Sequence, residues 1–337
     1  DAVRTANEKG RLHQLRASWP PANEPFICVL GERGQSIPVV HILPDKSIVA
    51  RIGAPYINGK VVQIQGDSVT DLEDVEFFGV SPNRRFFGFA TPAGVRVTDG
   101  WGGRDVVTFA WPKGTENIPK GFTIKKWETQ PTYSRIIPFP DANRVLLVSN
   151  GGVFVVSPEE CTRLLPTEAD MKEHFKWLQE EYPDDDLTIN LSMEHGSVSK
   201  NGKLIAIGSQ DSSHLVFDET LSLIGEIGNR SDYPHCAIFS AKDDVIAFNS
   251  CHFYNGATVG VSVNLLPDLK TKPYEDDDRV ALLEDNARVY AGVGLGDEFI
   301  IGDAYGYVRE FSTTGEPRWQ LYVGSSIGDI DVSDDGT

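Results

Sequence analysis

One short pattern recurs seven times along this chain: an apolar strand, a polar turn and a second apolar strand. Clear copies are VHILPDKSIVARI at 40–52, FGVSPNRRFFGFA at 78–90 and SVSKNGKLIAIG at 197–208. The remaining copies occupy 137–149, 238–249, 291–303 and 330–337. Asn-Gly and Asp-Gly pairs in such turns supply the positive φ angles of tight hairpins. Each copy therefore predicts two antiparallel strands joined by a short turn.

The spacing of the seven turns gives the period of the repeat. The intervals between successive turns are 38, 59, 59, 42, 53 and 39 residues, with the turns placed at Asp45, Asn83, Ala142, Asn201, Asp243, Gly296 and Asp335. Each long interval contains a segment without strand character, at 112–132, 167–186 and 266–278. Without these insertions the period is close to 40 residues throughout, which is typical of a β-propeller. We therefore expect an all-β, seven-bladed β-propeller with one helical insertion.

The same pattern predicts the limits of the blades. Six complete blades are expected near 36–74, 75–133, 134–166, 190–230, 231–286 and 287–324. Residues 325–337 begin a seventh blade, and the apolar segment 26–31 is a candidate to complete it. This gives an irregular segment at 1–25 and a single propeller domain at 26–337, whose last blade is truncated at the C-terminus.

Two blades carry a family resemblance. LIAIGSQDSSHLVFD at 204–218 resembles the middle strands of a WD40 blade, with Phe217–Asp218 where the Trp-Asp pair usually stands. The stretch 300–320 resembles a PQQ-like repeat, with a Thr-Gly turn before Trp319. No blade has a true Trp-Asp pair or the Gly-His start, so the chain resembles a divergent WD40-like propeller. Quinoproteins repeat the Thr-Gly…Trp motif and have adjacent paired cysteines, which are missing here. We therefore expect no cofactor and Trp319 packed between blades.

The charge restricts the partners. The net charge is −18 and the pI about 4.8, which disfavours binding to nucleic acid. No apolar run approaches the roughly 20 residues that span a bilayer, so no membrane insertion is expected. A protein partner with a basic surface fits this charge. We expect a cytoplasmic location, although a secreted or periplasmic one stays open because the sequence begins at Asp1 rather than Met.

The insertion at 167–186 reads as an amphipathic helix. Thr167 is a suitable N-cap, and one apolar face is formed by Met171, Phe175, Leu178 and Tyr182. The helix either docks on its own propeller or serves as a lid or partner-binding element. Trp177 lies off that face, and we assign it to a partner-binding surface together with Lys176 and Glu180. The insertion at 112–132 is lysine-rich, and the one at 266–278 reads as a solvated loop.

No strong catalytic motif is present, because the sequence lacks GxSxG, HExxH, Walker and EF-hand patterns. We therefore predict a non-catalytic protein-binding scaffold. The alternative is a metal-dependent hydrolase or lyase at the mouth of the axial channel. Aligning the blades places Glu76, Glu194, His195, His235 and Asp329 near that mouth. In this alternative His195 and His235 are metal ligands, and Glu194 or Asp329 is a ligand or base. The competing interpretation is that both histidines form hydrogen bonds between blades.

Overall fold

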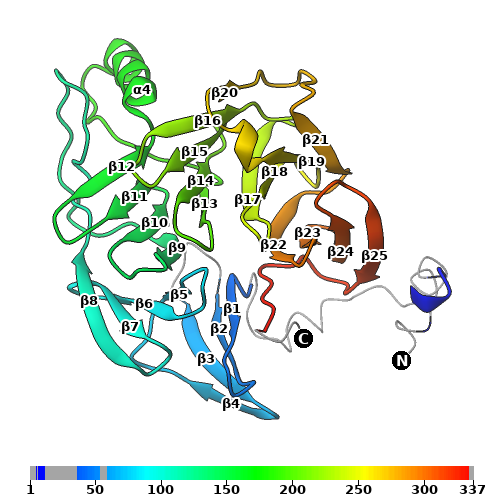
Figure 1. The fold of residues 1–337 in the computed structure, drawn as a ribbon. Helices are drawn as coiled ribbons and strands as arrows, with labels where there is room; N and C mark the ends of the chain where they lie inside the picture. The colour runs from blue at the N-terminus through cyan, green and yellow to red at the C-terminus, as the bar shows by residue number, and fades with distance from the viewer. Residues whose placement is uncertain (1–4, 6, 12–35, 54–58, 334–337) are drawn as a thin grey trace, which may run out of the picture.

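Six antiparallel sheets are arranged around one axis in the computed structural model, which describes residues 5, 7–11, 36–53 and 59–333 (Figure 1). Blade one contains β1 (Val39–Ile42), β2 (Ile48–Ile52), β3 (Lys60–Gln65) and β4 (Ser68–Asp71). Blade two contains β5 (Phe78–Val80), β6 (Phe86–Thr91), β7 (Gly94–Asp99) and β8 (Arg104–Ala110). Blade three contains β9 (Tyr133–Pro138), β10 (Val145–Ser149), β11 (Gly152–Val156) and β12 (Cys161–Leu165). Blade four contains β13 (His195–Val198), β14 (Leu204–Gly208), β15 (His214–Asp218) and β16 (Leu223–Ile227). Blade five contains β17 (Tyr233–Phe239), β18 (Val245–His252), β19 (Asn255–Ser262) and β21 (Val280–Asp285). Blade six contains β22 (Val289–Leu295), β23 (Glu298–Asp303), β24 (Tyr307–Ser312) and β25 (Pro317–Tyr322). These sheets match the six complete blades predicted from the sequence.

The prediction of seven blades was wrong. Within 36–53 and 59–333 the strands form six sheets, and residues 323–333 contribute no strand. The C-terminal segment instead runs between blade six and blade one (red in Figure 1). It meets β1 through side chains, because the carboxylates of Asp329 and Asp331 accept hydrogen bonds from the amides of Val40 and Ile42. These carboxylates accept the backbone hydrogen bonds of β1 that the carbonyl oxygens of a neighbouring strand would otherwise accept, so this edge of β1 is satisfied without a strand ladder. The predicted strand at 26–31 and residues 334–337 lie outside the described residues.

The cores lie between neighbouring blades, and strand alternation explains how one strand serves two of them. All five residues of β10 are buried. Leu147 packs in the cluster shared with blades one and two, whereas Leu146 and Val148 pack in the cluster shared with blade four. Successive side chains of a strand point to opposite faces, so a strand between two blades must be apolar on both. This is why the repeat reads as continuous apolar runs rather than strict alternation.

Close to the axis the strands approach so tightly that glycine is required. A Cβ added at Gly79 of β5 would lie 1.6 Å from the carbonyl oxygen of Ile136 in β9. That separation is far inside van der Waals contact, so any other residue would push the two inner strands apart. Gly79 therefore sets the approach of blade two to blade three.

The insertion at 112–132 is anchored on blade three. The buried guanidinium of Arg163 in β12 donates to the carbonyl oxygens of Gly151 and Gly114, both at 2.7 Å, and to that of Glu116 at 3.1 Å. Trp127 packs edge-on against Phe154 with ring centroids 5.8 Å apart. The insertion contains no strand, as expected.

The expectation of a solvated loop at 266–278 was wrong. Its residues form β20 (Leu269–Lys270), which pairs in parallel with β16 as a fifth strand of blade four. Leu266 and Leu269 are buried in the core between blades four and five. These two leucines explain the difference, because they give the segment an apolar anchor that its acidic end at 275–278 conceals in the sequence. A short 3-10 helix, η1 (Val263–Leu265), precedes it.

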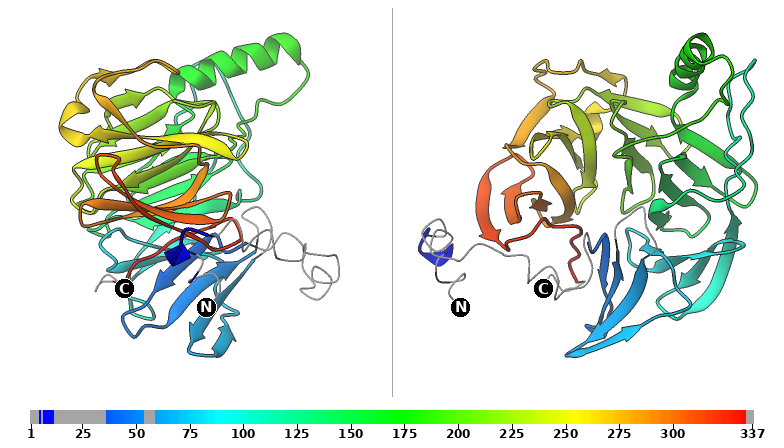
Figure 2. Two further views of the ribbon diagram at one scale, coloured as in Figure 1. Left: turned by 90° about the vertical axis from the view of Figure 1, so that its right-hand side faces the viewer. Right: turned by 180° about the vertical axis from the view of Figure 1, so that it is seen from behind.

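The insertion at 167–186 forms α4 (Glu168–Glu181), which lies along the rim of the disc and projects beyond its sheets (Figure 2). None of the helices in the described part of the chain has the length and apolar character needed to cross a membrane.

Cys161, Cys236 and Cys251 are free thiols. The expectation that Trp319 packs between blades was wrong, because its side chain on β25 is 45% exposed.

Candidate functional site

Two cavities lie on the axis of the propeller. The exit-side cavity, of about 470 Å³, lies where the inner strands end. The entry-side cavity, of about 800 Å³, lies where they begin. They meet at a middle section whose residues line both: Arg135, Ile137, Ser197, Ala237, Ile238, Gly292 and Asp329. Concave sites lined by a few converging polar groups are where ligands bind most often, so both cavities are candidate sites.

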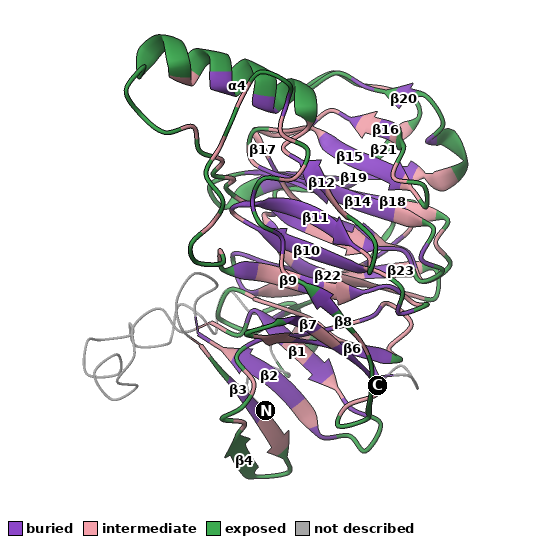
Figure 3. Ribbon diagram, turned by 90° about the vertical axis from the view of Figure 1, so that its left-hand side faces the viewer, coloured by how far each residue is buried: buried purple, intermediate pink, exposed green. Residues whose placement is uncertain are grey.

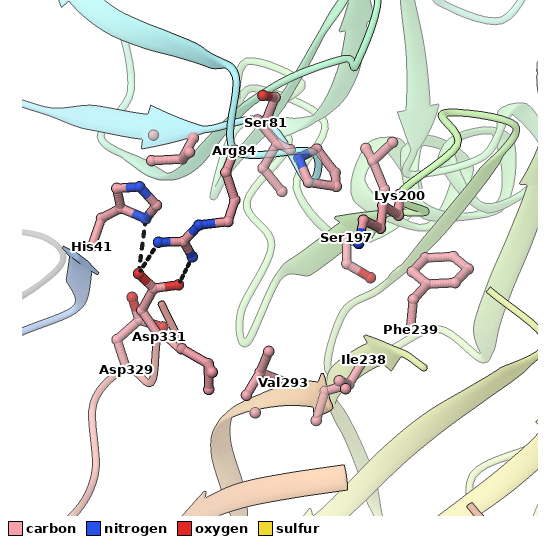
Figure 4. A pocket seen from close by; sticks show the side chains of 18 of the residues that line it. His41, Ser81, Arg84, Ser197, Lys200, Ile238, Phe239, Val293, Asp329 and Asp331 are labelled. Atoms are coloured by element: carbon pink, nitrogen blue, oxygen red, sulfur yellow. Dashed lines mark hydrogen bonds and ion pairs between the residues drawn. The ribbon is translucent and has the colours of Figure 1, made fainter. Parts of the chain in front are cut away.

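In the exit-side cavity, Asp331 is the centre of a charged cluster (Figure 4). Its carboxylate lies 2.5 Å from Arg84 Nη1 and 2.9 Å from His41 Nδ1. It also accepts the amide of Ile42 at 2.7 Å. Burial alone would raise the pKa of Asp331, but the hydrogen bonds from His41 and Arg84 outweigh it and hold that pKa below its ordinary value. The charges of this cluster are satisfied among themselves, which indicates a structural role.

The entry-side cavity brings together four of the residues that the sequence placed at the channel mouth. Glu194, His195, His235 and Asp329 all line it. Glu76, from the same prediction, is exposed and is not among the lining residues. Aligning the blades on their turns therefore located the mouth correctly for blades four and five and for the C-terminal segment.

The ring of His235 is fixed by neighbours on both of its nitrogens. Nδ1 lies 2.7 Å from the carbonyl oxygen of Val289, and Nε2 lies 3.1 Å from Nη2 of Arg288. Burial and the adjacent guanidinium lower the pKa of His235 to about 3. A neutral imidazole that donates from Nδ1 accepts at Nε2, so Arg288 occupies the lone pair that a metal ion would need.

His195 is neutral for a similar reason. Its Nδ1 lies 3.0 Å from the carbonyl oxygen of Met193, and burial lowers its pKa to about 4. Its Nε2 is buried without a hydrogen-bond partner and packs close to Gly208, where an added Cβ would lie 2.8 Å away. The buried ring of His214 lies 5.5 Å from it, centroid to centroid. Among the described residues, no three His, Cys, Asp or Glu side chains are grouped to hold a metal ion. The metal site stays a prediction.

On α4 two of the four residues of the sequence-predicted inner face are buried, and Leu178 is half-buried. Thr167 and Asp170 form a reciprocal capping box at its N-terminus. Met171 and Phe175 are buried, and the ring of Phe175 packs 5.4 Å from that of Phe122 in the 112–132 insertion. Tyr182 does not continue this face, because it is the C-cap residue and is 51% exposed. The helix therefore docks on its own protein through Met171 and Phe175.

The outer face of α4 carries the three residues that the sequence assigned to partner binding. Trp177, Lys176 and Glu180 are all exposed, Trp177 at 48%. The indole stacks on His174 with ring centroids 5.9 Å apart and meets Tyr182 edge-on at 5.8 Å. Figure 3 shows most of the α4 ribbon in the colour of exposed residues. We call Trp177, His174 and Tyr182 the α4 aromatic cluster.

A second group of exposed aromatic residues was not predicted from the sequence. The tip of the β18–β19 hairpin presents Phe253 and Tyr254, which are 73% and 58% exposed. Tyr305 packs 5.8 Å from Tyr254 and donates to Asn255 at 2.9 Å. The sequence signal that could have identified this group is the pair Phe253–Tyr254 at the two central positions of a hairpin turn, where Asn-Gly is usual. The two cavity arginines, Arg135 and Arg288, were missed as well, because neither belongs to a motif.

The comparisons with known proteins show the fold alone. No family model matches the chain, and no curated protein matches it. Among solved structures, the β-propeller domain of Cps50 (Swd1) from Myceliophteria thermophila is similar, with a TM-score of 0.49 and 10% sequence identity over 86% of this chain and 87% of that one. This similarity is one of overall fold, and the β-propeller itself is established by the six sheets arranged around one axis.

Proposed function

We propose that this protein is a non-catalytic scaffold that binds a basic segment of a partner protein through the outer face of α4. The observation that carries the proposal is an exposed tryptophan on a helix whose opposite face is anchored in the fold. A tryptophan in this setting exposes a large apolar ring at little entropic cost, because the helix beneath it is already ordered. Tryptophan is also enriched among the residues that dominate binding energy at interfaces.

The charge around Trp177 selects the partner. Glu173, Glu180 and Glu181 lie four residues before, three after and four after Trp177, so they are its neighbours on the helix surface. All three are exposed, as are the residues of the acidic run at 184–186 that follows. An arginine or lysine of the partner would lie over the indole in a cation–π contact and pair with one of these carboxylates. The net charge of −18 adds a long-range attraction for a basic surface.

A selection of peptides on the immobilised protein tests this function. Twelve-residue random peptides are selected on the wild type and compared with those retained by Trp177→Ala. We expect the wild-type pool to be enriched in arginine and lysine, and its peptides to bind Trp177→Ala at least tenfold more weakly. Trp319→Ala is the matched control, because Trp319 is similarly exposed, at 45%, but lies on β25. Pools without basic enrichment, or equal binding to Trp177→Ala, would show the proposal to be wrong.

A further inference from the structure

The entry-side cavity contains a guanidinium with free hydrogen-bonding capacity. Arg288 directs Nε and Nη2 at the single acceptor Nε2 of His235, at 3.4 and 3.1 Å, and Nη1 at the carbonyl oxygen of Phe253 at 3.1 Å. A guanidinium has five N–H donors, so these contacts leave two, one on each Nη nitrogen. Two such donors match the two oxygens of a carboxylate.

The charge of Arg288 is not balanced by a nearby acid. Among the described residues no carboxylate lies within ion-pair distance of it. Its side-chain neighbours are the neutral ring of His235 and the face of Tyr290, 5.0 Å apart, with the guanidinium 4.9 Å over the tyrosine ring. A partly buried cation without a counterion is costly, and a bound anion would remove that cost.

The position of Arg288 is set by an unusual turn. Its backbone amide donates to Tyr254 at 3.0 Å, and its side chain donates to Phe253, so the hairpin tip holds it at both ends. Phe253 adopts a φ of 54°, which is rare for a bulky residue. Strained backbone of this kind concentrates at binding sites. The turn therefore holds Arg288 at the cavity mouth.

Arg135 gives the cavity a second guanidinium. It donates to the carbonyl oxygens of Pro38 at 2.8 Å and Ser134 at 3.1 Å, and its nearest carboxylate oxygen, on Asp329, is 3.8 Å away. That carboxylate accepts the amide of Val40 through its other oxygen, and burial raises the pKa of Asp329. Glu194, the other acid of the lining, is buried at 7% exposure and has a contact of its own.

Neutral polar groups complete the lining. Asn150, Asn190 and Gln210 supply amides, and Ser134 and Ser192 supply hydroxyls. A volume of about 800 Å³ falls within the range of small-molecule sites.

We propose that the entry-side cavity binds a small polar carboxylic acid, whose carboxylate lies on the two free donors of Arg288 and whose polar remainder meets Arg135 and the amides. A carboxylate suits this site better than a phosphate, because its two planar oxygens match the geometry of a guanidinium and each carboxylate carries only one charge, while two acidic side chains share the lining.

Calorimetric titration with succinate and with succinamide, its uncharged isostere, tests the proposal at constant ionic strength. We expect saturable binding of succinate and at least tenfold weaker binding of succinamide. Arg288→Gln should weaken succinate binding at least tenfold, whereas Arg318→Gln should not, because Arg318 lies on β25 outside the cavity and pairs with Glu298. Thermal melts confirm that each variant is folded. Arg288→Lys, which keeps the positive charge but loses the planar pair of N–H donors, should also bind succinate at least tenfold more weakly.

Three results would overturn the proposal: no binding of succinate at 10 mM, equal binding of succinamide, or unchanged affinity in Arg288→Gln and Arg288→Lys. Inorganic phosphate is titrated in parallel. Phosphate binding that is tighter than succinate and lost in Arg288→Lys would replace the carboxylate with a phosphate and so overturn the assignment of ligand class. None of these outcomes depends on Trp177, so this site and the proposed partner surface stand or fall separately.

Discussion

Asp331 and Ile42 are 289 positions apart in the sequence, yet the Asp331 carboxylate accepts the backbone amide of Ile42 at 2.7 Å. Two residues earlier on each segment, Asp329 accepts the amide of Val40 at 2.8 Å over the same separation. The two contacts repeat with the period of a strand. The C-terminal segment is therefore aligned on the inner edge of blade one by carboxylates, and blade one is joined to the end of the chain without a shared sheet.

We expect Asp331→Asn to weaken this connection. The amide keeps the shape of the side chain but removes the charge that Arg84 and His41 contact. Charge-assisted hydrogen bonds of partly buried groups are worth about 2–3 kcal/mol, so the free energy of unfolding should fall by about that amount in urea titrations. Asp297→Asn removes an equally close contact, the 2.5 Å pair with Lys242, but at an exposed site. It should leave the urea midpoint unchanged. Equal effects of the two substitutions would contradict a specific role for Asp331.

The sequence predicted the repeat but not how the ring ends. Period and turn residues are local signals, so they located six blades and the helix at 167–186. Blade number depends on whether the last copy of the pattern pairs with another segment, and that is a long-range property. In the copy at 330–337 the pattern reads Asp331 as a strand residue ahead of the turn at Asp335, whereas in the fold its carboxylate contacts Arg84. Whether a residue at such a position joins a strand ladder or an ion pair depends on groups far along the chain, so the pattern alone could not distinguish the two.

Stability should fall as the pH drops from about 6.5 to about 4. His195 has an ordinary pKa of 6.5 when unfolded, and burial lowers it to about 4 in the folded protein. Between these values the unfolded chain binds a proton that the folded chain does not, so acid favours unfolding. One such proton corresponds to about 1.4 kcal/mol per pH unit.

His195→Gln should therefore reduce the slope of unfolding free energy against pH by about 1.4 kcal/mol per unit in this window. Urea titrations at several pH values measure the slope. Any loss of packing in the variant would shift the whole curve, including the value at pH 8, without changing its slope. An unaltered slope would mean that His195 binds a proton equally in both states.

Gly79→Ala should be among the most destabilising single-methyl additions in this protein. The added Cβ would lie 1.6 Å from the backbone oxygen of Ile136, which cannot move without displacing β9. We expect a loss of about 3 kcal/mol or more in the free energy of unfolding. Gly225→Ala is the matched control, since its Cβ would meet the flexible side chain of Leu266 at 3.1 Å. A loss at Gly225 as large as that at Gly79 would argue against the tight approach of β5 and β9.

The candidate site shows the same division between local and long-range information. Trp177 was found from helical periodicity, because burial of one face follows from spacing along one helix. Arg288 was not found, because its importance depends on a missing counterion and on a hairpin tip 34 residues earlier in the sequence, at Tyr254. Such relationships require the positions of separate blades, which spacing along the chain does not give.

The two faces of α4 should respond differently to truncation. Phe175 is fully buried against Phe122, so Phe175→Ala should lower the free energy of unfolding by about 3–5 kcal/mol. Trp177 is 48% exposed and its ring contacts are with other exposed rings of the α4 aromatic cluster, so Trp177→Ala should change stability by less than about 0.5 kcal/mol. Urea titrations of the two variants measure both values. If Trp177→Ala instead costs several kcal/mol, the indole belongs to the packing of the helix, and weaker peptide binding by that variant could no longer be assigned to a lost contact with the partner.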